Sequence, residues 1–105
     1  MTQKRAYERK KRRFLVEFKL EGAPCTGFTN DVSPSGMFIR STRLPTPGTF
    51  VTVNLHLPEE RRVVLRGKVV RSVRVPPALS RLIPNGFALH FSDTPEEYFQ
   101  FFATL

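Results

Sequence analysis

A chain of 105 residues has room for one domain and excludes a second. Its ten Phe and nine Pro favour short strands and exclude long helices. The formal net charge of +8 is concentrated at the N-terminus, because residues 1–13 hold seven Lys or Arg against one Glu. Such a basic segment suits a phosphate-bearing partner, although a solvated tail that aids solubility has the same composition.

Cysteine content and hydropathy indicate the cellular setting. The single cysteine, Cys25, cannot form an internal disulfide and has no cysteine partner for a metal site, which suits a reducing compartment. No apolar stretch approaches the roughly 20 residues that span a bilayer. The basic N-terminus also lacks the apolar segment that would follow it in a signal peptide. We therefore expect a cytoplasmic protein with no membrane insertion.

The chain begins with a charged segment and continues as strands. Residues 1–12 lack apolar periodicity, which predicts a flexible basic arm, and residues 13–105 would form the folded domain. Alternating apolar residues predict a first strand whose buried face holds Phe14, Val16, Phe18 and Leu20. After a turn at residues 21–27, further strands are expected at residues 28–32, 37–41, 49–57, 63–75 and 86–91. Gly67, in the middle of the longest strand, predicts a bulge or a sharp bend.

The last segment, "DTPEEYFQFFATL", changes from strand to helix periodicity. Thr94 is expected as the N-cap, with Pro95 at the first helical position and Glu97 completing a capping box. One face of the helix would carry Tyr98, Phe101, Phe102 and Leu105. Six strands and one C-terminal helix predict a mainly β domain, built as a small antiparallel barrel or a strongly curved sheet. The helix would cover an open end or side of it.

Residues suited to catalysis are sparse. His56 and His90 fall on the polar sides of strands, where an exposed histidine is the simpler interpretation. The acidic pairs occur in a turn, at Glu59 and Glu60, and at a helix start, where the helix dipole favours them. Neither metal-ligand spacing nor a phosphate-binding glycine loop occurs. We therefore expect no enzyme activity, no metal and no cofactor.

Two motifs near predicted strand ends have the chemistry to bind a guanine nucleotide. Arg9 and Arg13 stand four apart before the first strand, and Arg binds phosphate or the N7 and O6 edge of guanine with two parallel hydrogen bonds. Asp31 and Ser33 lie in the loop "DVSPSG". A carboxylate at this place would accept hydrogen bonds from the N1–H and N2–H groups of a guanine. Gly36 allows a tight turn or a close approach to a ligand. Taken separately, the loop is also explained as an Asx-type turn, and the arginine spacing by chance in a basic run.

Together the motifs resemble the PilZ domain, a bacterial receptor module for cyclic di-GMP. That family carries Arg-x-x-x-Arg before the first strand and Asp/Asn-x-Ser-x-x-Gly after the second, which here are "RKKRR" (9–13) and "DVSPSG" (31–36). "RGKVVR" (66–71) and "NGFALHF" (85–91) are similar to two further family patterns. The resemblance spans nearly the whole chain. It implies a six-stranded antiparallel split barrel with a short C-terminal α-helix.

The resemblance also implies a role for each motif residue. The arginines would bind phosphate and a guanine edge, the Asp and Ser would contact a guanine, and the Gly would shape the loop. The implied ligand-binding residues are Arg9, Arg13, Asp31, Ser33 and Gly36. Arg12 and Arg40 are secondary candidates for phosphate contact. Arg5 and Arg9 have the same spacing, but Arg13 leads directly into the first strand, as the second family arginine does.

The function implied is a cyclic di-GMP receptor and adaptor. Ligand binding would order the N-terminal arginine arm over the nucleotide, and the signal would pass to an unidentified downstream protein. One alternative is an adaptor of the same fold that binds proteins and no ligand. Another is a small β-barrel that binds RNA or DNA with strong salt dependence. Nucleic-acid binding is less favoured than the adaptor because most Phe residues fall on core-facing strand positions rather than on a stacking surface.

Overall fold

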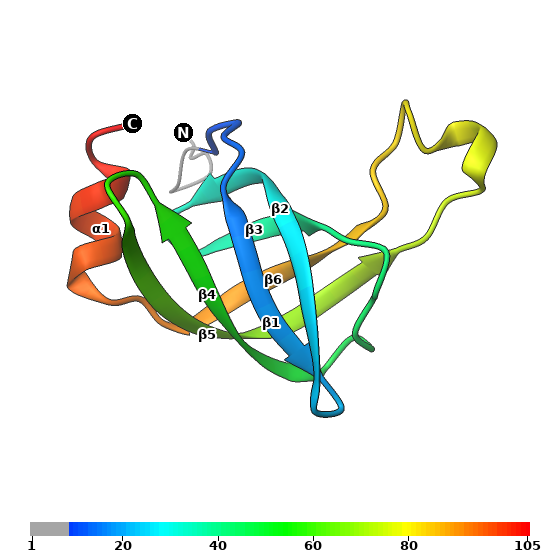
Figure 1. Ribbon diagram of the computed structural model, residues 1–105, viewed down its shortest axis with the longest axis horizontal. Coiled ribbons are helices and arrows are strands. Elements are labelled where there is room, and N and C mark those ends of the chain that lie inside the picture. The colour runs from blue at the N-terminus through cyan, green and yellow to red at the C-terminus, as the bar shows by residue number, and fades with distance from the viewer. Residues whose placement is uncertain (1–8) are drawn as a thin grey trace, which may run out of the picture.

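The structure is a computed structural model that describes residues 9–105, so most of the predicted arm, residues 1–8, lies outside the described residues. Six antiparallel strands form a barrel in the order β1-β2-β3-β6-β5-β4, and the pairing of β4 with β1 closes it (Figure 1). The strands are β1 (Leu15–Leu20), β2 (Ala23–Ser33), β3 (Gly36–Arg40), β4 (Phe50–Leu57), β5 (Arg61–Val73) and β6 (Gly86–Asp93). The predicted barrel is therefore confirmed.

Strand β2 begins earlier than predicted. Residues 21–27 were expected to be a turn, but the turn consists of Glu21 and Gly22 alone, with φ values of 51° and 81°. Two left-handed residues form the tight hairpin turn that matches the twist of paired strands. Because Leu20 and Ala23 already pair across this turn, the small residues that follow are held in the sheet by β1.

The predicted loop at residues 31–36 is also shorter than expected. Asp31 and Ser33 belong to β2, and only Pro34 and Ser35 separate it from β3. The register of β2 against β3 shifts between Thr29 and Asp31, which marks a bulge. The extra residue changes the alternation, so Thr29 and Val32 both face the core, each about 1% exposed. Asp31 is thereby turned toward the outer surface.

The bulge predicted at Gly67 is confirmed, because the pairing of β5 with β6 shifts between Arg66 and Gly67. The barrel interior is filled by aliphatic and aromatic side chains from every strand and from the C-terminal helix. Large fully buried members are Val16, Met37, Ile39, Leu55, Leu65, Phe87, Leu89 and Tyr98. This core fixes the positions of the strand ends from which the candidate site is built.

Helix α1 (Glu96–Phe102) closes one end of the barrel, beside the turn between β4 and β5 (Figure 1). Tyr98 and Phe101 are buried in the core, as the helical periodicity predicted. The predicted capping box is wrong, because the N-cap is Pro95 and no side chain caps the helix. The Thr94 hydroxyl instead donates to the Pro34 carbonyl oxygen at 3.1 Å. That bond ties the helix start to the β2–β3 turn.

Among residues 9–105, no helix has the length and apolar character needed to cross a membrane. The same residues contain no group of three or more His, Cys, Asp or Glu side chains arranged to hold a metal ion.

Candidate ligand-binding site

The segment that carries the two arginines lies along β2. Lys10 and Val32 exchange two backbone hydrogen bonds, of 2.8 and 2.9 Å. Further along, the backbone N–H of Thr29 donates to the Phe14 carbonyl oxygen at 2.9 Å. Residues 9–14 therefore lie along β2 as a continuation of β1, with Arg9 near the start of this segment and Arg13 near its end.

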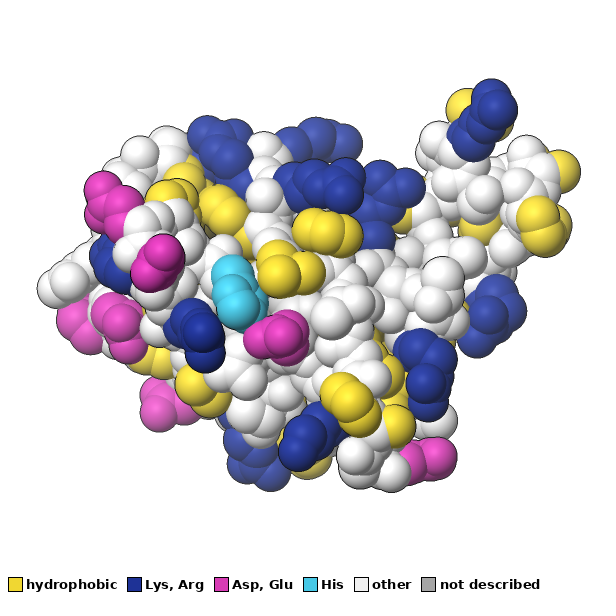
Figure 2. Space-filling model, in the orientation of Figure 1, with side chains coloured by type: hydrophobic (Ala, Val, Ile, Leu, Met, Phe, Trp, Pro, Cys, Tyr) yellow, Lys and Arg dark blue, Asp and Glu magenta, His cyan; other side chains and the backbone are white. Residues whose placement is uncertain are grey.

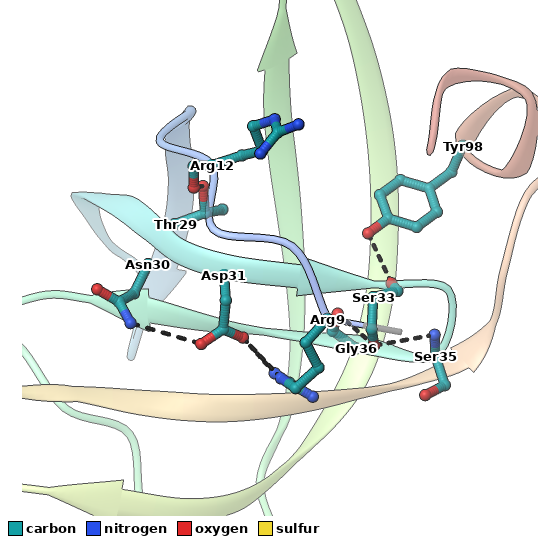
Figure 3. A network of polar contacts seen from close by, with 9 residues as sticks. All are labelled: Arg9, Arg12, Thr29, Asn30, Asp31, Ser33, Ser35, Gly36 and Tyr98. Atoms are coloured by element: carbon teal, nitrogen blue, oxygen red, sulfur yellow. Dashed lines mark hydrogen bonds and ion pairs between the residues drawn. The ribbon is translucent and has the colours of Figure 1, made fainter. Parts of the chain in front are cut away.

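The buried Thr29 hydroxyl holds the middle of this segment in place (Figure 3). It donates to the Arg12 carbonyl oxygen at 2.6 Å and accepts from the Phe14 backbone N–H at 2.8 Å. A threonine hydroxyl has one donor and two acceptor sites, so it can bond two backbone groups at once. Here the hydroxyl fixes the residues on both sides of Arg13, which limits where the Arg13 side chain starts.

Arg9 and Asp31 come from the two sequence motifs and form an ion pair (Figure 3). The Arg9 Nε lies 2.9 Å from Asp31 Oδ1, and its Nη2 contacts the same oxygen. The other carboxylate oxygen lies 3.4 Å from the Asn30 side-chain nitrogen. The Arg9 side chain remains 45% exposed and that of Asp31 20% exposed, so both groups face solvent at the outer surface.

Ser33 and Gly36 form the β2–β3 turn. The Ser33 side chain is buried, donates to the Gly36 carbonyl oxygen at 3.2 Å and accepts from the Ser35 N–H at 3.3 Å. These are the backbone-capping bonds of a turn. A Cβ on Gly36 would lie 2.4 Å from the Leu89 carbonyl oxygen, so the glycine is needed where β3 approaches β6. Both residues shape the turn, and their contact with a ligand stays a prediction.

Tyr98 connects the helix to this turn. Its hydroxyl donates to the Ser33 carbonyl oxygen at 2.8 Å, and its ring packs edge-to-face on Phe91 with centroids 5.2 Å apart. Burial raises the pKa of the Tyr98 phenol above its usual range, and the positive charge of Arg9 lowers it by less. The tyrosine therefore stays neutral and keeps its proton for the carbonyl.

Arg13 lies in a group of positively charged side chains next to an exposed aromatic ring. Its guanidinium carbon lies 4.1 Å from the centroid of the Phe28 ring, a cation–π contact on a ring that is 37% exposed. The two side chains border an open hollow of about 250 Å³. Its lining residues are Lys11, Arg12, Arg13, Phe28, Thr29, Asn30 and Arg40. Four positive side chains around one small hollow give it a strong attraction for anions.

The family model of the PilZ domain matches residues 3–102, which is almost the whole chain. The chain belongs to the PilZ domain family. A comparison with curated proteins gave no match.

Three solved structures are similar in fold. The Bacillus subtilis inhibitor of motility (MotI/DgrA) has a TM-score of 0.75 at 19% identity, over 94% of this chain and 47% of that one. The PilZ domain of YcgR from Escherichia coli, solved with c-di-GMP, has a TM-score of 0.71 at 12% identity, over 90% and 82%. The PilZ domain of CeSA from a cellulose-synthesizing bacterium scores 0.62 at 18% identity, over 92% and 93%. This chain therefore spans about half the length of the motility inhibitor.

The PilZ motif residues divide between two neighbouring places. Arg9, Asp31 and the β2–β3 turn lie together, whereas Arg13 faces the hollow with the secondary candidates Arg12 and Arg40. Asn30, which lines the hollow and contacts Asp31, joins the two. Three residues of the site, Thr29, Phe28 and Tyr98, were not predicted from the sequence to belong to it. Thr29 offered no signal, because in the strand expected at residues 28–32 it shares a face with Asp31 and not with the apolar Phe28 and Val32.

Proposed function

We propose that this PilZ domain is a receptor for cyclic di-GMP and acts as an adaptor rather than an enzyme. The observation that carries the proposal is the contact between Arg9 and Asp31, since it brings together the basic and acidic motifs required to read guanine. Arg13 and Arg40, beside the hollow, would supply the charge for the two phosphates. The family membership and the YcgR structure solved with c-di-GMP support this choice of ligand.

Binding would exchange one set of hydrogen bonds for another. The Asp31 carboxylate accepts from Arg9 in the free protein, and it would accept from the guanine N1–H and N2–H in the complex. Breaking the existing pair costs little, because exposed ion pairs contribute roughly 0–1 kcal/mol. The released Arg9 guanidinium would then bind a phosphate or the N7 and O6 edge of the base.

Arg13 is prepared for a similar contact. Its cation–π contact with Phe28 holds the guanidinium beside the hollow, which reduces the rotamer entropy lost when a ligand binds. The exposed part of the Phe28 ring would give a purine an apolar surface. Ser33 and Gly36 would contribute through the shape of the turn that carries Asp31.

The same contacts suggest how binding would be transmitted. Lys10 pairs with β2 through its backbone, and its ammonium group lies 3.2 Å from the Leu105 carbonyl oxygen and 5.7 Å from the Phe102 ring centroid. Movement of Arg9 toward a ligand would therefore shift a segment that touches the C-terminal helix. The rearranged arm and the ligand would together form the surface that a downstream protein recognises.

Isothermal titration calorimetry with cyclic di-GMP tests the proposal, with GMP and cyclic di-AMP as controls. We expect selective binding at micromolar concentration or tighter, and the stoichiometry gives one ligand or an intercalated pair. Absence of heat with cyclic di-GMP, or equal heats with all three nucleotides, would overturn the receptor function and favour an adaptor that binds proteins alone.

A further inference from the structure

The connection between β5 and β6 projects from the barrel and exposes apolar side chains. In Figures 1 and 2 this loop, residues 74–85, extends away from the body of the molecule at the upper right, with apolar and basic side chains toward its tip. Leu79, Leu82 and Ile83 are 42%, 80% and 45% exposed. Large apolar side chains that project together from a surface are typical of a contact site.

Within residues 79–83, which carry the exposed apolar side chains, four of the five backbone N–H groups donate to carbonyl oxygens of the loop itself. A short 3₁₀ turn, Pro77–Leu79, begins it, and the N–H groups of Leu82 and Ile83 both donate to the Leu79 carbonyl oxygen, at 3.0 and 2.9 Å. Those of Leu79 and Ser80 donate to proline carbonyl oxygens, at 2.9 and 3.3 Å. The three prolines of residues 76–84 have no N–H group. A backbone of this kind enters an apolar medium with few unpaired donors.

The root of the loop is held by Asn85. Its side-chain oxygen accepts from the Val75 N–H at 2.6 Å, and its backbone carbonyl oxygen accepts from the Ser41 N–H at 3.2 Å. These bonds join the two ends of the loop to each other and to the end of β3. The exposed side chains are therefore presented on a fixed support, which lowers the entropy cost of contact.

Charge around the loop has one sign. The loop and the strand ends next to it, residues 71–91, contain three arginines and no Asp or Glu. Arg81 lies within the loop and Arg74 at its start, and Arg40 lines a hollow with Asn85 at the root. Acidic side chains gather at the opposite end of the molecule, near α1 and the β4–β5 turn (Figure 2). The charge complement of this end is therefore an anionic surface.

We propose that the loop docks on the surface of an anionic phospholipid bilayer. Leu79, Leu82 and Ile83 would enter the interfacial region, while Arg74 and Arg81 remain at the headgroups. A convex apolar tip suits a bilayer, which yields to admit it, whereas a protein partner would have to supply a matching cavity. Each basic residue near an anionic leaflet should contribute roughly fivefold to binding. This peripheral contact requires no spanning helix and is independent of nucleotide binding.

Vesicle sedimentation provides the first test, using the full chain without nucleotide. We expect the protein to sediment with mixed phosphatidylglycerol and phosphatidylcholine vesicles at low salt, and much less with phosphatidylcholine alone. Leu82→Asp should reduce binding at least roughly tenfold. Val64→Asp is the matched control, because Val64 is a 56% exposed apolar residue on the outer face of β5 and the charge change is identical. Equal losses in the two variants, or no binding by the wild type, would overturn the proposal.

A fluorescence measurement tests insertion directly. The chain contains no Trp, so Leu82→Trp introduces a single reporter at the tip and Val64→Trp one on the barrel wall. On anionic vesicles we expect a blue shift of the emission for Leu82→Trp and no shift for Val64→Trp. A Leu82→Trp emission that is unchanged by vesicles would show that the tip stays in water, and lipid docking would be rejected.

Discussion

The candidate site contains two regions that differ in burial and in purpose. The charged groups of the motifs, Arg9, Arg13 and Asp31, lie at the surface and contact one another or an exposed ring. The small polar groups beside them are closed off from solvent, because the Thr29 and Ser33 side chains are each about 1% exposed and hydrogen-bonded within the fold. Motif residues can therefore be required for different reasons.

This difference separates binding from folding. A surface charge can be removed without opening the core, since few buried contacts depend on it. A buried hydroxyl or a glycine at a close approach cannot, because neighbouring groups lose their partner or their space. The motif should therefore divide into substitutions that reduce affinity alone and substitutions that reduce stability first.

The largest effect is expected for Arg13→Ala. Loss of a charge-assisted bidentate contact should reduce cyclic di-GMP affinity by over a hundredfold, or about 3 kcal/mol. The free energy of unfolding should change by less than about 1 kcal/mol, since only the exposed cation–π contact with Phe28 is lost. Calorimetry with the ligand and urea denaturation measure the two quantities.

Arg74→Ala is the matched control for that prediction. It removes one exposed arginine and the same charge from a position outside the hollow around Arg13. We expect nearly wild-type affinity for cyclic di-GMP. Similar losses in both variants would mean that general charge, and not the motif, attracts the nucleotide.

The next largest effect is expected for Gly36→Ala, and it should lower the free energy of unfolding. The new Cβ would lie 2.4 Å from the Leu89 carbonyl oxygen, so β3 and β6 would have to separate. We expect the free energy of unfolding to fall by about 2–3 kcal/mol, as measured by urea denaturation.

Gly48→Ala provides the comparison for Gly36→Ala. A Cβ at Gly48 meets nothing within 4 Å, but its φ of 94° strains any side chain. We expect a cost of about 1 kcal/mol there. If Gly36→Ala proved the milder of the two, the close approach of β3 to β6 could not be the reason for the glycine.

Much of this arrangement follows from the sequence. Period-two alternation predicted the strands, and the change of period predicted the helix, because both depend on short-range patterns that the barrel preserves. Residue chemistry and family resemblance placed Arg9 and Asp31 in one site, and the two side chains are in contact in the structure. These features need only local periodicity and the identity of charged groups.

Other features depend on partners far along the chain. The bulge that follows Thr29 appears only when β2 is set against β3, and without it Asp31 would face the core. The early start of β2 likewise depends on its pairing with β1. Thr94 resembled an N-cap, but its hydroxyl bonds Pro34, which lies 60 residues away. Local patterns could not predict these long-range contacts.

Thr29→Val tests whether the buried polar groups beside the site also position the charged side chains at the surface. The substitution keeps the shape but leaves the Phe14 N–H and the Arg12 carbonyl oxygen without their hydroxyl partner. Stability should fall by about 2 kcal/mol, and cyclic di-GMP affinity should fall several-fold because Arg13 lies between these two groups. Thr29→Ser keeps the hydroxyl and should restore affinity. Unchanged affinity in Thr29→Val would show that the Thr29 hydroxyl contributes to folding and does not position Arg13.

The smallest effect is expected at Tyr98. Its buried hydroxyl donates to the Ser33 carbonyl oxygen, and its pKa is raised by burial and lowered by less by the positive charge of Arg9. Tyr98→Phe removes the hydrogen bond to the Ser33 carbonyl oxygen and should cost about 1 kcal/mol at neutral pH.

The pH dependence gives this variant its own signature. Burial raises the pKa of Tyr98 in the folded protein, so above the usual tyrosine pKa of about 10 the unfolded chain loses a proton that the folded protein keeps. Below that pH the tyrosine is neutral in both states and adds no pH dependence. Above it, wild-type stability should decline with rising pH by up to about 1.4 kcal/mol per pH unit more than that of Tyr98→Phe. Parallel stability curves above pH 10, followed by urea denaturation, would show that the phenol is not buried as a neutral donor and would remove the link between the helix and the β2–β3 turn.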